Sequence, residues 1–599
     1  MIHSFHIPVL GLAYTVSTPF KVAKYGISSV VSIVDDILIE EMRKFHSQEF
    51  NKPYTPIAPD AQDSRAQRTT AYLNLMKEVV EEQFEALRNE PFEEGTDITR
   101  YFEMLPETEE LKQLYNDMLA TTEVKAKLSL QEKLRGLIKP GNIDVNIMSK
   151  VDKNNVNADG EVLEAIYSDA LASLRGFANS NLESSIILSA GMNPRLYSYL
   201  EEFPDFFANE LGEIKKKVVL KVSDYRSAVI QGKFLAKKGI WVSEFRVESG
   251  LNCGGHAFAT SGLLMGPILE EFKNKREEII DSIFEIYQKA LAEKGIALSS
   301  PPKMNVSAQG GIGTHKEDVF LREYYQLEST GWGTPFLLVP ETTQVDDDTL
   351  KRLVEAKPTD FYISNASPLG VPFSNFRNSS IEEERLKRIA KGVPGSPCKK
   401  KFLVSNTEFG AEPLCLASRK YQHLKINQLN EQNLPQEEHD EQFNAITEKI
   451  CLCEGLSVSA YIKNNIQRKE KNRAVAICPG PNMAYFNRII TLEEIVGHIY
   501  GKINLLSNSS RPHVFVNELN LYVEYLQNDI KQSFKSLNDK KIKYLNDFKN
   551  QLLQGIAYYK ELVPKMTKES LNNRTAILKQ FQDIEIFLKQ LEIKTPVLA

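Results

Sequence analysis

The chain has 599 residues, of which 42% are hydrophobic and 25% are charged, and its formal net charge is −6. These are the proportions of ordinary globular proteins, and the length allows several hydrophobic cores or one large elaborated domain. Because the net charge is small and no long basic block occurs, a nucleic-acid reader and a polybasic membrane binder are both disfavoured.

The stretch from Phe5 to Ile33 is fairly apolar, but proline, glycine, serine and lysine interrupt it. We therefore expect neither a signal peptide nor membrane insertion there. Six cysteines are too few for a disulfide scaffold in a chain of this length. A reducing, cytoplasmic setting is expected.

Short apolar runs alternate with stretches of helical periodicity along much of the chain. Parallel strands joined by crossover helices have this pattern. So many successive units favour an α/β fold of the (β/α)8 TIM barrel type over a small open sheet. The expected strands lie within 6–13, 143–151, 184–191, 217–223, 240–249, 303–311 and 332–339.

Three stretches fall outside this alternation. Residues 37–141 are charged and helical, and we expect them to form a helical insertion after the first βα unit, 1–36, with the rest of the barrel in 142–380. Residues 381–490 contain most of the cysteines and lack regular periodicity. Residues 491–599 are helical again, and their apolar stripes predict a C-terminal bundle that packs on the barrel rather than a partner-binding coiled coil.

Two glycine-containing turns follow the last expected strands. Gly310-Gly311 and Gly333-Thr334 fall where the final loops of a barrel commonly hold a phosphate. Glycine lets backbone N–H groups approach phosphate oxygens, and a following helix adds its positive end. Alternatively, the glycines serve only tight turns. The occurrence of both turns favours a phosphate-bearing cofactor that lies across them.

A third glycine-rich turn, ESGLNCGGHAF, follows the expected strand that ends near Val247. His256 in this turn would point into the barrel mouth, where it could act as an acid, a base or a hydrogen-bond donor. The alternative is a histidine with a structural role at a helix start. The neighbouring Cys253 is expected to be a small packed residue rather than a nucleophile.

Four motifs resemble, in order and spacing, those of the nitronate monooxygenase (2-nitropropane dioxygenase-like) family, which also contains flavin-type enoyl-acyl carrier protein reductases. They are GGHA at 254–257, SAQGGIG at 307–313, WGTPFLLVPE at 332–341 and SPLGVPFSNFRN at 367–378. VNIM at 145–148 and LSAGMNP at 188–194 are similar to two earlier strands of the family. The resemblance covers 1–36 and 142–380.

The resemblance implies an FMN-dependent oxidoreductase that acts on a small organic or acyl substrate, as a nitronate monooxygenase or an enoyl reductase does. The glycines and Thr334 would hold the phosphate and the ribityl chain, Ala13, Asn146 and Lys221 would lie near the isoalloxazine ring, and His256 would be the active-site histidine. The cofactor-binding residues implied in this way are Ala13, Asn146, Lys221, Gly254, Gly255, Gly310, Gly311, Gly333 and Thr334. Acyl carrier protein or a synthase would be the partner of an acyl-chain reductase, and a homo-oligomer is compatible with the sequence.

The cysteines are the other chemical feature. Cys415, Cys451, Cys453 and Cys478 supply enough thiolates for one zinc ion or an iron–sulfur cluster. Their wide, irregular spacing matches no recognised ligand pattern, so small buried cysteines are the alternative. Cys398, among lysines, is either a substitute ligand or a solvated loop residue. A further hypothesis is a non-catalytic binding or assembly protein, built on the barrel scaffold with a structural metal held by these cysteines.

Overall fold

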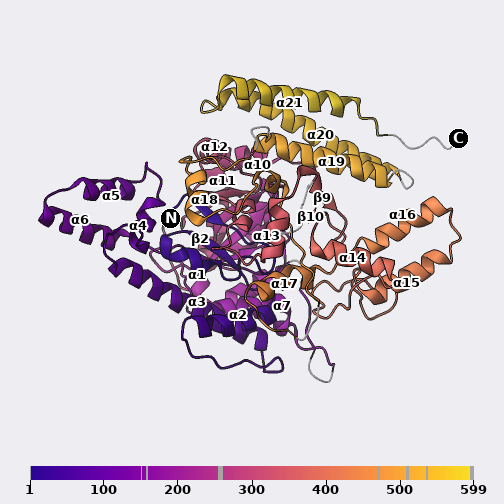
Figure 1. Cartoon of the computed structure of the whole chain (residues 1–599), viewed down its shortest axis with the longest axis horizontal. Coiled ribbons are helices and arrows are strands. Elements are labelled where there is room, and N and C mark those ends of the chain that lie inside the picture. Colours follow the sequence, from indigo (N-terminus) through magenta and orange to yellow (C-terminus); the bar gives the residue numbers. More distant parts are fainter. Residues whose placement is uncertain are drawn as a thin grey trace.

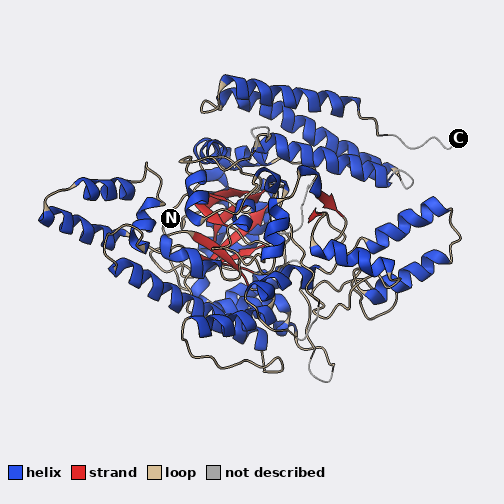
Figure 2. Cartoon of the chain, viewed as in Figure 1, coloured by secondary structure: helices blue, strands red, loops and turns tan. Residues whose placement is uncertain are grey.

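Eight parallel strands close into a barrel at the centre of the molecule, with helices around it (Figure 2). This computed structural model describes residues 2–149, 152–156, 160–253, 261–468, 472–507, 511–533 and 537–593. Each strand pairs with the next, and β8 returns to β1 through Phe5–Thr330 and His6–Gly331. The predicted (β/α)8 barrel is confirmed. Its strands are β1 (Phe5–Ile7), β2 (Ser28–Ser32), β3 (Ile143–Asn146), β4 (Ser185–Leu188), β5 (Lys217–Val222), β6 (Val242–Glu248), β7 (Asn305–Gln309) and β8 (Ser329–Gly331).

The helical insertion occupies the predicted stretch, since its first helix begins at Asp36, but a second barrel strand, β2, precedes it. β2 pairs with both β1 and β3, so the insertion lies between β2 and β3. The prediction missed β2 because its five residues, SSVVS, are buried throughout and sit inside a longer apolar stretch without alternation. The closing strand β8 directly precedes 332–339, where a strand was expected and the short 3-10 helix η5 (Thr334–Leu338) is found.

Crossover helices cover the outside of the barrel. Helix α12 begins with a capping box between Thr314 and Glu317, and Asp346 caps α13 as the first of the three aspartates 346–348. That acidic run is therefore a helix start. The helices of this layer are α1 (Thr18–Val22), α7 (Asp169–Ala178), α8 (Pro194–Tyr199), α9 (Tyr225–Ala236), α10 (Met265–Asn274), α11 (Arg276–Ala292), α12 (His315–Tyr325) and α13 (Asp347–Val354).

The insertion consists of five helices, of which α5 and α6 project away from the barrel at the left of Figure 1. Its longest helix, α3, buries apolar residues at helical spacing, among them Tyr72, Met76 and Val80. This face packs into the same hydrophobic core as the barrel. The five are α2 (Asp36–Glu49), α3 (Ser64–Asn89), α4 (Asp97–Glu103), α5 (Glu110–Ala120) and α6 (Val124–Leu137).

The region expected to be irregular contains helices. Helices α14 and α16 bury few residues, whereas α17 is buried over most of its surface, and neither arrangement gives a clear apolar stripe. Helices α15 and α16 extend to the right in Figure 1. An antiparallel pair, β9 with β10, precedes it. These elements are β9 (Phe361–Ser364), β10 (Phe373–Phe376), α14 (Ser380–Ala390), α15 (Arg419–Asn430), α16 (Gln436–Thr447) and α17 (Leu452–Lys463).

Short 3-10 helices occur throughout the described part of the chain. They are η1 (Ala23–Tyr25), η2 (Ala165–Tyr167), η3 (Leu200–Glu202), η4 (Pro204–Phe206), η5, η6 (Pro358–Asp360), η7 (Pro481–Tyr485) and η9 (Val563–Lys565).

The C-terminal part is helical, as predicted, and forms a layer across one side of the barrel (yellow in Figure 1). Its helices are α18 (Leu492–Ile499), α19 (Val514–Ser533), α20 (Asp539–Leu562) and α21 (Leu571–Gln590). The apolar stripe of α20 from Leu545 to Tyr559 is buried. No described helix combines the length and apolar character needed to cross a membrane.

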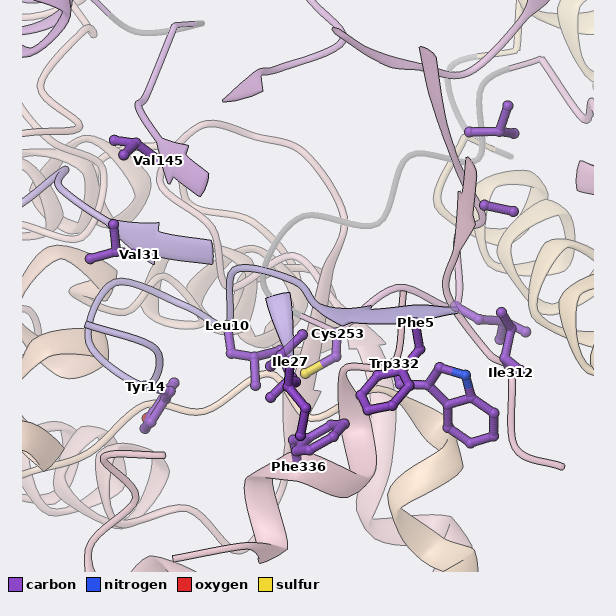
Figure 3. Packing of buried hydrophobic residues seen from close by; sticks show 14 of the residues in the cluster. Phe5, Leu10, Tyr14, Ile27, Val31, Val145, Cys253, Ile312, Trp332 and Phe336 are labelled. Atoms are coloured by element: carbon purple, nitrogen blue, oxygen red, sulfur yellow. The ribbon is translucent and has the colours of Figure 1, made fainter. Parts of the chain in front are cut away.

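The hydrophobic core joins these parts around the barrel. Figure 3 shows Leu10, Cys253, Trp332 and Phe336 packed together beside the strands, with the sulfur of Cys253 among the apolar side chains. Burial raises the pKa of the Cys253 thiol, which donates to the carbonyl of Cys478 at 3.2 Å. Cys253 is thus the packed residue that the sequence predicted.

A buried carboxyl group connects the C-terminal layer to the barrel. Glu518 of α19 accepts a hydrogen bond from the amide of Met265, the first residue of α10, at 2.9 Å. Tyr559 of α20 lies 3.4 Å from the same oxygen. Burial raises the pKa of Glu518 to about 7. The folded protein therefore holds a proton there at pH values where the unfolded chain has released it.

This carboxyl group predicts a pH dependence of stability. As pH rises from about 4.5 to 7 the unfolded chain binds fewer protons at Glu518 than the folded protein, so folding stability falls across this window. Glu518→Gln, which cannot ionise, should gain up to about 3 kcal/mol relative to wild type between pH 5 and pH 8. Thermal unfolding at fixed ionic strength measures the difference. Parallel pH profiles for the two proteins would contradict it.

Candidate active site

A cavity of about 270 Å³ lies at the mouth of the barrel, where the carboxyl ends of the strands meet. Its volume is near the lower end of those of small-molecule pockets. One side is polar and formed by strand ends, and the other is apolar and formed by later segments. The lining residues are Val9, Gly11, Leu12, Val34, Asn146, Ile147, Met148, Ser189, Ala190, Lys221, Glu248, Asn252, Leu369, Val371, Phe373, Phe402, Leu403, Leu452, Cys453 and Leu456.

The polar side, the floor of the cavity, is organised around Glu248 at the end of β6. Its Oε1 atom lies 3.1 Å from Nζ of Lys221, which belongs to β5. The same oxygen accepts hydrogen bonds from the side-chain amides of Asn252, at 2.9 Å, and Gln309, at 2.6 Å. Because one carboxylate gathers three donors from different barrel segments, the ammonium group of Lys221 is held in place at the cavity wall.

The interior below the floor is also polar. Glu244 and Arg246 precede Glu248 at alternate positions of β6, which face the same side of the sheet. Arg246 is buried and donates to Glu244 at 2.8 Å, and Ser307 of β7 donates to the same carboxylate. Burial lowers the pKa of the neighbouring His6 to about 3, so this histidine is neutral. Glu244, Arg246 and Ser307 thus satisfy one another beneath the cavity, whereas Nε2 of His6 is buried without a hydrogen-bond partner.

The apolar side, the roof, comes from segments that follow the barrel in sequence. Leu369 and Val371 lie in the loop between β9 and β10, Phe402 and Leu403 lie in the loop before α15, and Leu452 begins α17. The site thus combines a charged, hydrogen-bonding floor with an apolar cover. A flat ligand with apolar faces and one polar edge suits these surroundings.

The two predicted phosphate turns lie side by side on the barrel rim. Gln309 pairs with Gly331, so 310–311 and 333–334 leave adjacent strands at the same end. Gly310 and Gly311 have φ values of 108° and 80°, and a Cβ on Gly311 would lie 2.4 Å from the side chain of Leu251. A tight turn therefore requires these two glycines whether or not a phosphate binds.

The segment that contains η7 covers part of this rim. The amide of Asn482 donates to the carbonyls of Gly311, at 2.7 Å, and Ile312, at 3.1 Å. Arg511 donates to Gly311 and to Asn482 and forms a buried ion pair with Glu317. The hydroxyl group of Thr334 donates to the carbonyl of Pro479 at 2.7 Å.

These contacts bear on the fit of FMN. The polar floor and the apolar roof would suit its ring, and Lys221 and Asn146, which the resemblance implies lie near that ring, line the cavity. At the phosphate end Gly333 is half-buried, whereas Thr334 already has a hydrogen-bond acceptor in the chain. Of the two ends of FMN, the flat ring is the one whose size and polarity the cavity would fit. Gly254, Gly255 and His256 lie outside the described residues.

Ala13 does not line the cavity, although the resemblance implied that it lies near the isoalloxazine ring. It is fully buried in the core, while its neighbours Gly11 and Leu12 line the cavity. The cause is the turn after β1, in which Gly11 has a φ of 57° and redirects the chain. Leu12, rather than Ala13, is the residue of this turn that borders the site.

The cysteines gather differently from the predicted set. All six cysteines are free, and Cys415 and Cys453 are buried whereas Cys398 and Cys451 are half-buried. Cys478 lies elsewhere, beside Cys253. Among the described residues, no three histidine, cysteine, aspartate or glutamate side chains are arranged to hold a metal ion. The predicted four-cysteine set is thus not brought together.

Several residues of the site were not predicted from the sequence. Glu248 had a detectable signal, because it is a carboxylate at the end of an expected barrel strand, where catalytic groups are commonly found. Gln309 is likewise a polar residue at the end of an expected strand, and Asn252 lies in the loop that follows β6. Phe402 and Leu403 had no such signal, since they lie in a stretch without regular periodicity and meet the cavity only through the tertiary fold.

No protein-family model matches this chain, and a search of curated proteins finds no similar sequence. The family resemblance therefore stays a prediction.

Asn482 offers a test of how the rim is held. Asn482→Ala removes the donor to Ile312 and leaves a nitrogen of Arg511 without its acceptor. Unsatisfied buried groups cost about 1 to 3 kcal/mol each, so we expect a loss of about 2 to 4 kcal/mol in the free energy of unfolding. Urea denaturation measures it, with exposed Asn89→Ala as the control. Equal stability of both variants would show that Asn482 does not hold the rim.

Proposed function

We propose that the protein is a flavin-dependent oxidoreductase that binds FMN at the barrel mouth and acts on an apolar or acyl substrate. One observation carries the proposal: the ion pair between Lys221 and Glu248 lies at the carboxyl-terminal rim of a closed barrel, under an apolar roof. In TIM-barrel enzymes this rim is the catalytic face. The resemblance to the nitronate monooxygenase family points to the same face.

The charged floor suits the polar edge of a flavin. Lys221, whose side chain is 13% exposed, supplies a positive charge at the cavity wall, and Glu248 holds that side chain in position. A cation fixed in this way stabilises negative charge on a bound group more effectively than a solvated one does. Asn146, at the end of β3, borders the same cavity and would add a side-chain amide.

Bound FMN would supply the hydride or electron-pair chemistry of the reaction. The chain's own residues would bind the substrate and exclude water, since Leu369, Phe402 and Leu403 place apolar surface over the cavity. This surface favours an acyl chain or another apolar substrate over a highly charged one. His256, which follows β6 in the sequence, remains the candidate for moving a proton.

A charge-removing substitution tests the role of the floor. Lys221→Met should weaken FMN binding about tenfold or more, because a charge-assisted hydrogen bond is worth about 1.5 to 3 kcal/mol. Lys217→Met makes the same chemical change on the same strand, but at its exposed amino-terminal end, and should leave the affinity unchanged. Quenching of flavin fluorescence measures both dissociation constants. Equal affinities for the two variants would refute the assignment of the floor.

A further inference from the structure

A buried carboxylate lies where the sequence predicts a ligand phosphate. The first of the two expected phosphate turns, 310–311, leads into α12, and Glu317 stands in the first turn of that helix. Its side chain is 2% exposed, and its Oε2 atom accepts hydrogen bonds from the amides of Gly313, at 2.9 Å, and Thr314, at 3.2 Å. A negative charge of the chain therefore already occupies the end of α12 that favours a phosphate.

A second helix begins at the same carboxylate. The Oε1 atom of Glu317 accepts a hydrogen bond from the amide of Val514, the first residue of α19, at 2.7 Å. The guanidinium group of Arg511 donates to this oxygen at 2.7 Å, and the side chain of Arg511 is 3% exposed. Two helix starts and one buried cation thus surround a single side chain, as they would surround a bound anion.

These surroundings keep Glu317 ionised. Burial acts to raise the pKa of its carboxyl group, but the charges of Arg511 and His513, with hydrogen bonds from Arg511 and from the amide of Gly313, bring the pKa below its ordinary value. The chain itself therefore supplies a full negative charge at this position.

Arg511 also fills the space beside the first glycine turn. It donates to the carbonyl of Gly311 at 2.6 Å. It packs so closely on Gly313 that a Cβ atom there would lie 2.5 Å from Nε of Arg511. The lack of a side chain at Gly313 thus makes room for a side chain of the protein.

The segment 478–482 lies against the second turn. The hydroxyl group of Thr334 donates to the carbonyl of Pro479 at 2.7 Å. Gly480 has a φ of 73°, and a Cβ atom on it would lie 3.2 Å both from Oγ1 of Thr334 and from the carbonyl oxygen of Leu251. Because Asn482 also donates to the carbonyl of Gly311, this one segment contacts both of the expected phosphate turns.

The cavity at the barrel mouth does not extend to these turns. Residues 310–311 and 333–334 belong to the described part of the chain, and none of them lines the cavity. The charged groups that do line it are Lys221 and Glu248. The cavity thus offers polar contacts to a ring, whereas the place expected for a phosphate is taken by the chain.

We propose that Glu317 takes the place of a ligand phosphate, so that the site recognises the flavin ring alone and binds riboflavin as tightly as FMN. The ligand preference rests on the proposed function, whereas the filled anion position does not. Glu317 is a specificity-determining residue in this account, because its carboxylate already engages the donors that a phosphate would need.

The first test compares two flavins on the unaltered protein. Quenching of flavin fluorescence at equal ionic strength gives the dissociation constants of FMN and riboflavin. We expect FMN to bind no more than about threefold more tightly, because its phosphate gains no charge-assisted hydrogen bond. A larger preference for FMN would overturn the proposal, since one such bond to a phosphate contributes about tenfold or more in affinity.

The second test needs no flavin. Glu317→Ala leaves three amides and the guanidinium group of Arg511 without their shared acceptor, so its midpoint of thermal unfolding should fall below that of wild type. A neighbouring cavity of about 880 Å³, which Glu317 and Arg511 both line, gives inorganic phosphate a route to the vacated position. Phosphate, compared with chloride at the same ionic strength, should restore much of the lost stability.

A matched variant controls for the general effect of phosphate on protein stability. Glu323→Ala removes an exposed carboxylate from the same helix, and phosphate should stabilise it no more than it stabilises wild type. If phosphate stabilises Glu317→Ala and Glu323→Ala equally, Glu317 does not fill an anion position and the proposal fails.

The two tests separate this proposal from the proposed function. If neither flavin binds, the assignment of the cavity to a flavin fails, and the phosphate experiment still decides whether Glu317 fills an anion position. If Glu317→Ala does not fold, the comparison of FMN with riboflavin on the wild-type chain decides by itself.

Discussion

Closure of the barrel is the constraint on which the rest of the molecule depends. The pairing of β8 with β1 leaves no open edge, so all eight strands end on one ring. Lys221, Glu248 and Gln309 meet around one carboxylate oxygen because β5, β6 and β7 are adjacent. Closure brings Asn146 of β3 and the residues after β1 to the same cavity. A sheet that stayed open would bring together fewer strand ends, and the floor of the cavity is a direct product of the closed ring.

The roof has a different origin, because segments after the barrel supply it. The loop between β9 and β10, the loop at 402–403 and the start of α17 meet above the strand ends. One buried cluster of apolar residues runs through the barrel, the insertion and the C-terminal helices. The packing that stabilises the segments outside the barrel also places apolar surface over a polar floor. The stability of the fold and the shape of the cavity therefore depend on the same contacts.

The sequence predicted the barrel and most of its strands, because strand runs and crossover helices leave a local pattern. Asn146 and Lys221, which line the cavity, were implied only by the family resemblance. The sequence missed β2, which is short and buried on both faces, and it placed Ala13 at a position that Leu12 holds. The roof could not be predicted, since it depends on segments far apart in sequence. The periodicity of a short stretch predicts a helix or a strand, whereas contacts between loops depend on the completed fold.

Flavin binding at the barrel mouth is tested most directly by the visible absorbance spectrum of the full chain after incubation with FMN and gel filtration. If Lys221 and its neighbours hold the ring beneath the apolar roof, flavin absorbance should elute with the protein in a one-to-one ratio. A colourless protein peak, with all the flavin in the small-molecule fractions, would contradict the assignment of the cavity to FMN.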